Sequence, residues 1–341
     1  MSFIRTIEQF CAHVRVNVSG TDLENIEPDL SLVETQRLRP LLGPALYNDL
    51  QALSDTDLEE LLAKGNPDVR SELLRLVQRA AANLAMVEYM PLLQVLISDS
   101  GVNIMGGKTA FQWQIKDLKT GFTRKGYNAL EEVLEYLDTH IDAPALAAWG
   151  TSTAAVATHQ YFLATARQFS EHYAIGDSRL TYLALLPTLR KVERFDLAPA
   201  LGVALYAELK EQLIDRDLSA DNTELLNLYL RPALAHLVVA RALNGDVGLT
   251  LNGDAVELSM YRPDDSNAKE ADASFAQLLT MKAAAALADG RAFLTQARQY
   301  LNARASPTRF ASYFTSSAYT APTAPRPVVT NAAAGPTMRF F

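Results

Sequence analysis

The sequence predicts a mainly α-helical protein that is built from two tandem homologous repeats. Each repeat is expected to be a helical bundle with a protruding β-hairpin, and an extended C-terminal tail follows the second bundle. Three observations support this fold class. Residues 3–50 align with residues 162–209 without a gap, apolar residues recur at helical spacing, and the composition changes abruptly near Ala303.

The internal repeat sets the expected domain organisation. Repeat 1 should span residues 1–150 and repeat 2 residues 151–304, and each is long enough to bury a core of its own. The remaining residues, 305–341, are rich in proline, alanine and threonine and show no helical period, so we expect them to form an extended assembly tail.

Each repeat opens with a short amphipathic helix, because its apolar residues lie three or four positions apart. A second helix follows, at roughly 28–38 and 180–197, and should stop near the next proline, which has no N–H to donate. The apolar residues of the opening helix are Phe3, Ile7, Phe10 and Val14 in repeat 1, and Phe162, Ala166, Phe169 and Tyr173 in repeat 2.

A structural turn is predicted directly after this second helix. A glycine between apolar residues suits a turn with positive φ or a close approach of two helices. A tyrosine follows four residues later, and we interpret this spacing as packing rather than as a ligand site. The turn residues are Pro40, Gly43 and Tyr47 in repeat 1, and Pro199, Gly202 and Tyr206 in repeat 2.

The later part of each repeat predicts a long helix, a hairpin and a second long helix. The first long helix should cover about 70–93 and 222–243. Glycine-containing turns between short apolar runs then favour β-hairpins around 95–105 and 247–260. The expected hairpin tips include Gly101 in repeat 1, and Asn252 and Gly253 in repeat 2.

The C-terminal tail carries more aromatic residues than an inert linker would. A proline-rich strand of this kind is most easily held by another subunit. The residues expected to bind a partner are Phe310, Tyr313, Phe314, Tyr319, Arg326, Arg339, Phe340 and Phe341.

Composition and charge exclude several classes of protein. The single cysteine, Cys11, cannot form an intrachain disulfide and fits a reducing cytoplasm. No apolar run is long enough for a membrane span, and the first residues do not form an export signal. The net charge of −8 lies within repeat 1, so broad nucleic-acid binding is not expected.

No catalytic, cofactor or metal site is predicted. The segment 101–109 resembles a phosphate-binding loop, but its first glycine is one position too early. The five histidines lack the i, i+4 spacing of a helical metal site. The short run from Asp138 to Asp142 is expected to be a solvated helix end, and we expect the protein not to be an enzyme.

The segments PLLGPALYNDL, PALGVALYAEL and FLATARQFSEHYAIGDSRLTYLALLPTLRKVE resemble a family of helical proteins encoded among structural genes of prophages and phage-tail-like particles. The plan of short helix, bundle and hairpin also resembles the head–tail connector proteins of tailed phages, which form rings under the portal. This resemblance implies a head–tail connector or neck adaptor, made in the bacterial cytoplasm and located in the virion or phage-like particle. Its partners would be further copies of itself and the portal, neck or tail proteins.

Two alternatives remain open at this point. The first is a different position in such a particle, as a tail terminator, cap or baseplate adaptor. The second is a non-catalytic cytoplasmic binding module, which would be a stable monomer. The sequence contains no residue pattern that separates these alternatives.

Overall fold

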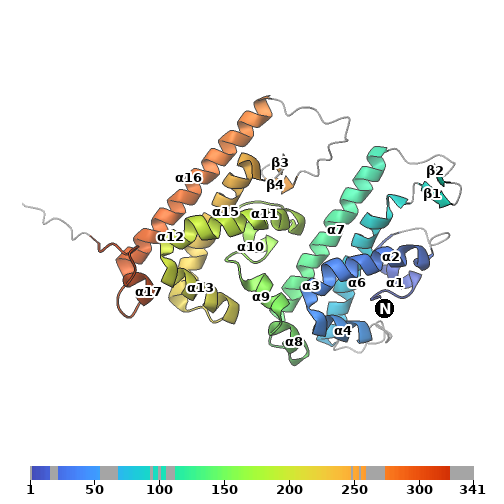
Figure 1. The fold of residues 1–341 in the computed structure, drawn as a ribbon, viewed down its shortest axis with the longest axis horizontal. Coiled ribbons are helices and arrows are strands. Elements are labelled where there is room, and N and C mark those ends of the chain that lie inside the picture. The colour runs from blue at the N-terminus through green and yellow to red at the C-terminus, as the bar shows by residue number, and fades with distance from the viewer. Residues whose placement is uncertain are drawn as a thin grey trace, which may run out of the picture.

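The computed structural model describes residues 2–15, 22–53, 68–92, 95–98, 101–104, 112–246, 249–252, 255–258 and 273–322. Over these residues the protein is mostly helical and consists of two similar units that follow one another along the chain (Figure 1). The predicted helical fold with two tandem repeats is therefore confirmed at this level.

Repeat 1 is a set of short helices packed against two long antiparallel helices. The short helices approach α6 from one side, while α7 covers α6 along its length. The elements of repeat 1 are α1 (Ile7–His13), α2 (Leu23–Val33), η1 (Glu34–Leu38), α3 (Arg39–Leu42), α4 (Pro44–Leu53), α6 (Val69–Tyr89) and α7 (Gln112–Thr139).

Repeat 2 reproduces this order after a connecting segment with η3 (Pro144–Leu146), α8 (Ala147–Gly150) and α9 (Thr153–His159). Its last helix, α16, covers α15 as α7 covers α6. The helices of repeat 2 are α10 (Ala166–Ser170), α11 (Arg179–Val192), η4 (Glu193–Leu197), α12 (Ala198–Leu201), α13 (Val203–Asp215), α14 (Ala220–Leu225), η5 (Leu226–Leu230), α15 (Arg231–Arg241), η6 (Ala242–Asp246), α16 (Ala273–Arg304) and α17 (Ala311–Phe314).

In each repeat, one short antiparallel strand pair lies between the two long helices in chain order. β1 (Val95–Ser98) pairs with β2 (Gly101–Ile104), and β3 (Leu249–Asn252) pairs with β4 (Ala255–Leu258). The register places Gly101 opposite Ser98 and Asn252 opposite Ala255, so both are strand residues rather than turn residues. Gly253 lies outside the described residues. Because β4 contacts α11, the second pair does not stand free of the helices, as was expected of a protruding arm.

The second helix of each repeat does not stop at its proline. A π-helical turn, η1 or η4, comes directly before α3 or α12, and the proline occupies the second residue of that next helix. In a π-helical turn the N–H groups bond one residue further back, which accommodates the missing donor and the bulk of the proline ring. The helix therefore continues to Leu42 and Leu201, and the following glycine ends it.

Two glycines set the distance between the long helices. A Cβ atom on Gly126 would lie 2.6 Å from the Leu84 side chain, and one on Gly290 would lie 2.7 Å from that of Leu237. A side chain at either position would require the facing leucine or one of the two helices to move. Glycine at positions 126 and 290 therefore allows the two long helices of each repeat to pack closely.

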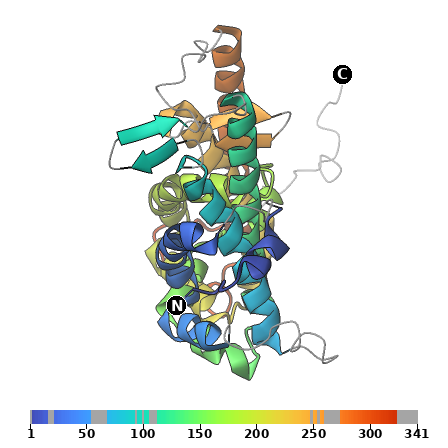
Figure 2. The same ribbon diagram turned by 90° about the vertical axis from the view of Figure 1, so that its right-hand side faces the viewer.

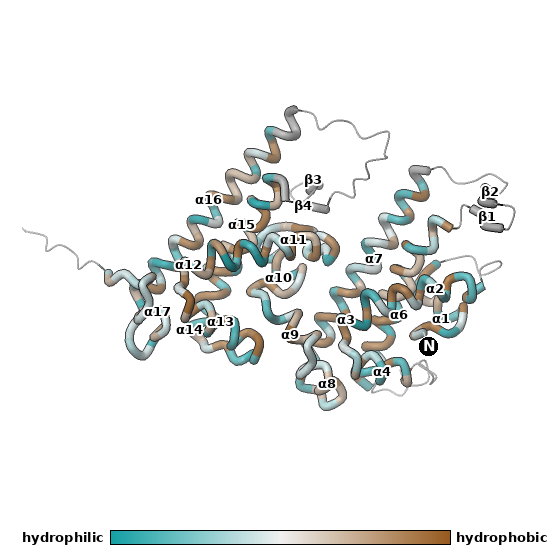
Figure 3. The backbone as a smooth tube through the Cα atoms, in the orientation of Figure 1, coloured by the Kyte–Doolittle hydropathy of each residue, from teal (hydrophilic) through white to brown (hydrophobic). Residues whose placement is uncertain are grey.

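The protein has two hydrophobic cores, one for each repeat. The first runs from Phe3 to Ala155, and the second begins at Tyr161. The boundary between the cores therefore lies near residues 156–160, not at residue 150, because the connecting segment packs on repeat 1. Apolar and polar residues are interspersed along the two long helices of each repeat (Figure 3).

The expected extended tail does not begin at residue 305. Phe310 is 7% exposed and Tyr313 is fully buried, and both belong to the core of repeat 2. Tyr319 packs against that core, and its ring centroid lies 4.8 Å from that of Phe314. Large aromatic side chains gain more by covering the repeat's own core than by remaining in water. Residues 305–322 are therefore part of repeat 2.

This closing segment of repeat 2 has a counterpart in repeat 1. A Cβ atom added to Gly43 would lie next to Ser152 and Ala154. One added to Gly202 would lie next to Ser316 and Ala318. The same spacing of 164 residues relates Trp149 to Tyr313, and both are fully buried. α17 therefore corresponds to α8, and Tyr313 is the equivalent of Trp149 in the second repeat.

Candidate functional site

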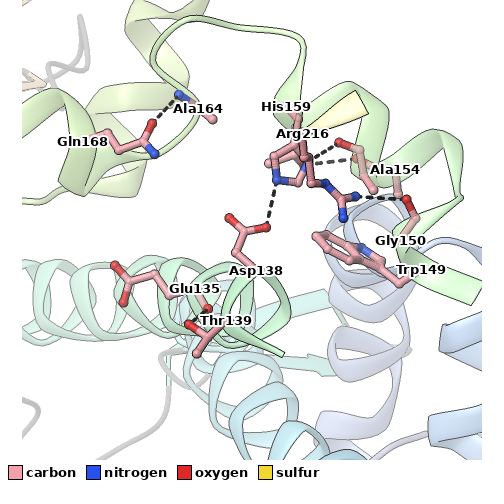
Figure 4. A network of polar contacts seen from close by, with 12 residues as sticks. Glu135, Asp138, Thr139, Trp149, Gly150, Ala154, His159, Ala164, Gln168 and Arg216 are labelled. Atoms are coloured by element: carbon pink, nitrogen blue, oxygen red, sulfur yellow. Dashed lines mark hydrogen bonds and ion pairs between the residues drawn. The ribbon is translucent and has the colours of Figure 1, made fainter. Parts of the chain in front are cut away.

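The most elaborate polar site of the described residues is the junction between the two repeats. Here the C-terminal half of α7 meets α10 and α11, and the connecting segment passes beside it (Figure 1, Figure 4). Residues 131–138 of α7 include four acids and no base, whereas α10 and α11 contain four bases and no acid. The junction therefore joins surfaces of opposite charge.

Glu131 is the buried centre of this junction. It is 4% exposed, and its Oε1 accepts hydrogen bonds from the backbone N–H groups of Ala166 at 2.5 Å and Arg167 at 3.3 Å. Its Oε2 forms an ion pair with Arg179 at 3.2 Å, and the Arg179 side chain is 10% exposed. One carboxylate from repeat 1 thus satisfies the first turn of α10 and neutralises a buried guanidinium of repeat 2.

A second ion pair borders the junction. Arg167 Nη1 lies 2.9 Å from Glu135 Oε2, one helical turn beyond Glu131. Burial raises the pKa of the Glu135 carboxyl, while the positive charge of Arg167 acts in the opposite direction. Because the Arg167 side chain is largely exposed, this pair adds less stability than the buried one.

The connecting segment is fixed by a third group of polar contacts, and Figure 4 shows the one between His159 and Asp138. His159 Nε2 lies 2.9 Å from Asp138 Oδ1, and the other ring nitrogen lies 2.7 Å from the carbonyl of Ala155. The Trp149 ring packs edge-on against His159, and its indole N–H donates to the carbonyl of Leu41. These contacts tie the connection to both α7 and the turn before Gly43.

The start of each repeat is held by a buried carboxylate at the π-helical turn. The N–H of Phe3 donates to Glu34 at 2.8 Å, and the N–H of Phe162 donates to Glu193 at 2.8 Å. Burial raises the pKa of both carboxyls. In repeat 2 the partner of Glu193 is Lys210, at 2.5 Å, and burial lowers the pKa of that ammonium group. The two glutamates lie in different cores and do not form a pair.

The predicted turn residues act as packing residues. Gly43 and Gly202 have φ values of 73° and 76°, the region that favours glycine. Tyr47 packs edge-on against Phe3 at 5.0 Å, and Tyr206 packs in the same way against Phe162. Burial raises the pKa of Tyr206 to about 12, so it remains a neutral phenol.

The residues predicted to bind a partner divide into two groups. Phe310, Tyr313, Phe314 and Tyr319 lie in or against the core of repeat 2, so they are not an accessible docking segment. The tail residues outside the described part of the chain are Arg326, Arg339, Phe340 and Phe341.

No group of three or more potential metal ligands occurs among the described residues. Within the same part of the chain, no helix has the length and apolar character needed to cross a lipid bilayer. The contacts described at the junction are hydrogen bonds and ion pairs between the two repeats.

The junction was not found by comparing the repeats for identical residues. Glu131 aligns with Thr295, and Arg167 aligns with Glu8, so the residues that join the repeats are those that differ between them. The distribution of charged residues in the sequence does indicate the junction. The segments that meet at the junction carry opposite charges, and their equivalents in the other repeat do not keep the same signs.

Comparison with protein families gives a result that agrees with the two-repeat fold. The model of a family of unknown function, DUF6712, matches residues 38–154 and again residues 197–323. These matches cover more than half of the chain. The chain belongs to the DUF6712 family. Each match to DUF6712 runs past the last long helix and includes the closing turn of α8 or α17.

No curated protein and no solved structure matches the chain.

Proposed function

We propose that this DUF6712 protein is a structural component of a phage or phage-derived particle. It acts as a head–tail connector or neck adaptor by assembling into a ring. The observation that carries the proposal is the head-to-tail packing of its two repeats. The end of repeat 1 binds the start of repeat 2, whereas among the described residues the start of repeat 1 and the end of repeat 2 have no equivalent neighbour.

This packing is heterologous, because two different surfaces of the repeat meet. Heterologous contacts that continue from chain to chain give either a closed ring or an open filament. A two-repeat chain that forms such a ring presents two helical units per subunit to the proteins above and below it. The strand pairs β1–β2 and β3–β4 and the residues beyond 322 are then candidates for contact with neighbouring subunits.

The position in the particle follows from the resemblance of the helical segments to phage structural proteins. The proposed partners are other copies of this chain and the portal, neck or tail proteins of the same particle. The mechanism is assembly through complementary surfaces, without a chemical step.

The test is the mass of the purified full-length protein over a wide concentration range. Light scattering would give the mass, and negative-stain imaging would give the shape. A closed ring, formed alone or on addition of purified portal, neck or tail proteins, is the expected result. A monomer at every concentration that does not bind those proteins would contradict the proposal and would favour a cytoplasmic binding module.

A further inference from the structure

We propose that copies of this chain associate end to end, with the outer face of α16 in one copy filling the hollow between α1 and α2 of the next. This inference rests on the ring assembly proposed above and names the two surfaces that meet. It follows from three features of the described residues. The first is an open hollow in repeat 1, the second is the equivalent surface of repeat 2, which α7 covers, and the third is the distribution of charge.

A hollow of about 680 Å³ opens between α1 and α2 at the start of repeat 1. One side is bordered by Ile7 of α1 and by Arg5 and Thr6 directly before it. The other side is bordered by Glu24 and Glu27 of α2 and by Asp22 directly before it. Figure 2 looks at the molecule from this end, and α1 and α2 lie at the front. We refer to this surface as the α1–α2 hollow.

The equivalent surface in repeat 2 is occupied by α7. Ile7 corresponds to Ala166, and the N–H of Ala166 donates to Glu131 of α7. Glu8 corresponds to Arg167, whose N–H and side chain both bind carboxylates of α7. The fold therefore already contains one long closing helix seated on this surface. In the part of the chain that the structure describes, no long helix is seated on the α1–α2 hollow as α7 is on its counterpart.

The helix that corresponds to α7 in repeat 2 is α16, and its equivalent face is open. Thr295 and Gln299 correspond to Glu131 and Glu135, and both are exposed. Arg291 lies one turn before Thr295 and Arg298 one turn after it, and both are also exposed. In Figure 1 this helix lies at the opposite edge of the molecule from α1 and α2. One copy can therefore offer the hollow to one neighbour and α16 to another.

The two open surfaces are complementary in charge. Three acids, Asp22, Glu24 and Glu27, and one base, Arg5, border the hollow, so its charge is net negative. Residues 291–304 of α16 contain three arginines and no acid, and of these Arg304 is paired with Glu224 of the same chain. At the junction within the chain the signs are reversed, with acids on α7 and bases on α10 and α11. Opposite potentials steer association and penalise pairing of like charges.

The opposite signs of charge at the junction and at the two open surfaces also determine which surfaces can pair. The acidic hollow of repeat 1 would repel the acidic half of α7, and the basic face of α16 would repel the basic face of α10 and α11. Only the end of repeat 2 and the start of repeat 1 remain complementary between copies. Like-charge repulsion against the wrong partner is a common source of specificity in protein interfaces. The occupant of the α1–α2 hollow is therefore a second copy of this chain.

The test uses charge reversal on each surface of the full-length protein. The hollow variant carries Glu24→Lys and Glu27→Lys, and the α16 variant carries Arg291→Glu and Arg298→Glu. Each should weaken self-association by about 10- to 100-fold, because two ion-pairing charges become repulsive. An equimolar mixture of the two variants, and a chain with all four changes, should associate again. Sedimentation velocity at low salt would measure the association, and circular dichroism would confirm folding.

The control variant carries Asp49→Lys and Glu211→Lys, two exposed acids outside the proposed surfaces, and should associate like the wild type. If the wild type assembles and the hollow and α16 variants assemble equally well, this interface is wrong while ring assembly stands. Failure of the mixture to restore association would overturn the proposed pairing of these surfaces. A wild type that remains monomeric, alone and with the particle proteins, would overturn both proposals.

Discussion

Glu131 satisfies two backbone N–H groups and one guanidinium of repeat 2 from a single buried side chain. A buried carboxylate in this position loses its hydration, and only the partners across the junction compensate for that loss. The same residue therefore contributes both to the stability of repeat 2 and to its placement on repeat 1.

Replacing Glu131 with glutamine should lower the free energy of unfolding by about 3–5 kcal/mol, because Arg179 would keep a buried charge without a counter-ion. Urea unfolding monitored by circular dichroism would measure the change. The matched control is Glu132→Gln, which removes a partly exposed pair with Arg79. This control should cost no more than about 1 kcal/mol. Equal effects of the two substitutions would show that burial of the junction carboxylate does not matter.

Gly202 combines a positive φ with a close neighbour, since a Cβ atom there would lie 3.1 Å from Cβ of Ser316. Gly202→Val should therefore cost at least about 1–3 kcal/mol of stability. Thermal unfolding would detect this as a lower melting temperature. Gly121→Ala is a useful comparison, because no atom lies within 4 Å of the added Cβ and α-helical residues surround it. That substitution should be neutral or stabilising, and a similar loss at both sites would contradict the strain at Gly202.

At the scale of elements, the repeat comparison predicted the helices well and the irregular segments poorly. The Thr6 and Gln9 pair recurs as Thr165 and Gln168 because each threonine accepts a hydrogen bond from the glutamine N–H and caps the helix. Such local signals are visible in a single sequence. The continuation of helices beyond Pro40 and Pro199 was missed, because a π-helical turn has no comparable sequence signature.

The closing turn around α17 was also missed, for a different reason. Its composition is typical of an unstructured tail, and only the core of repeat 2 supplies the surface on which Phe310 and Tyr313 become buried. Tertiary packing outweighed local composition in this segment. Trp149 and Tyr313 occupy equivalent places without being identical, so the search for matching residues did not align them.

Truncation of the chain distinguishes this segment from the residues that follow it. A chain that ends at residue 304 loses Tyr313 and Phe310, and removing one large buried aromatic side chain alone costs about 3–5 kcal/mol. We expect a strongly destabilised repeat 2, measured by urea unfolding. A chain that ends at residue 322 keeps every described core contact of repeat 2 and should unfold like the full-length protein. Equal stability of both truncated chains would place α17 outside the core.

At the scale of the whole molecule, three partly buried histidines should contribute a loss of stability in mild acid. Burial lowers the pKa of His13, His172 and His236 below the ordinary value of 6.5. As the pH falls through 6.5 toward the lower folded-state values, the unfolded chain binds protons that the folded protein does not, so the folded state loses stability. Buried Glu34 and Glu193 act with the opposite sign, because their raised pKa values favour the folded state at lower pH.

The histidine contribution can be isolated with His172→Gln. The difference in unfolding free energy between this variant and the wild type should change in favour of the variant as the pH falls from 8 through 6.5. Above pH 8 the difference should be constant, because the histidine is neutral in both states, and this range serves as the control. A difference that does not vary with pH would show that His172 titrates alike in the folded and unfolded protein.

The sequence predicted the number of repeats and the helical fold of the whole molecule, but not how the repeats contact one another. Internal similarity reveals the residues that both units need for their own cores, such as Phe3 and Phe162. The junction depends on residues that serve one unit only, such as Glu131 and Arg179. Their role became visible only when the folded chain brought α7 beside α10 and α11.

Duplication of the ancestral gene copied the closing turn together with the helices. The turn containing Trp149 follows α7 and leads into repeat 2, and the turn containing Tyr313 follows α16. The closing turn is therefore a point at which a further repeat can be joined to the one before it. A relative with a single unit should end just after this turn. A lengthened chain could be engineered by inserting a further unit there, provided that the unit carries acidic residues on its first two helices.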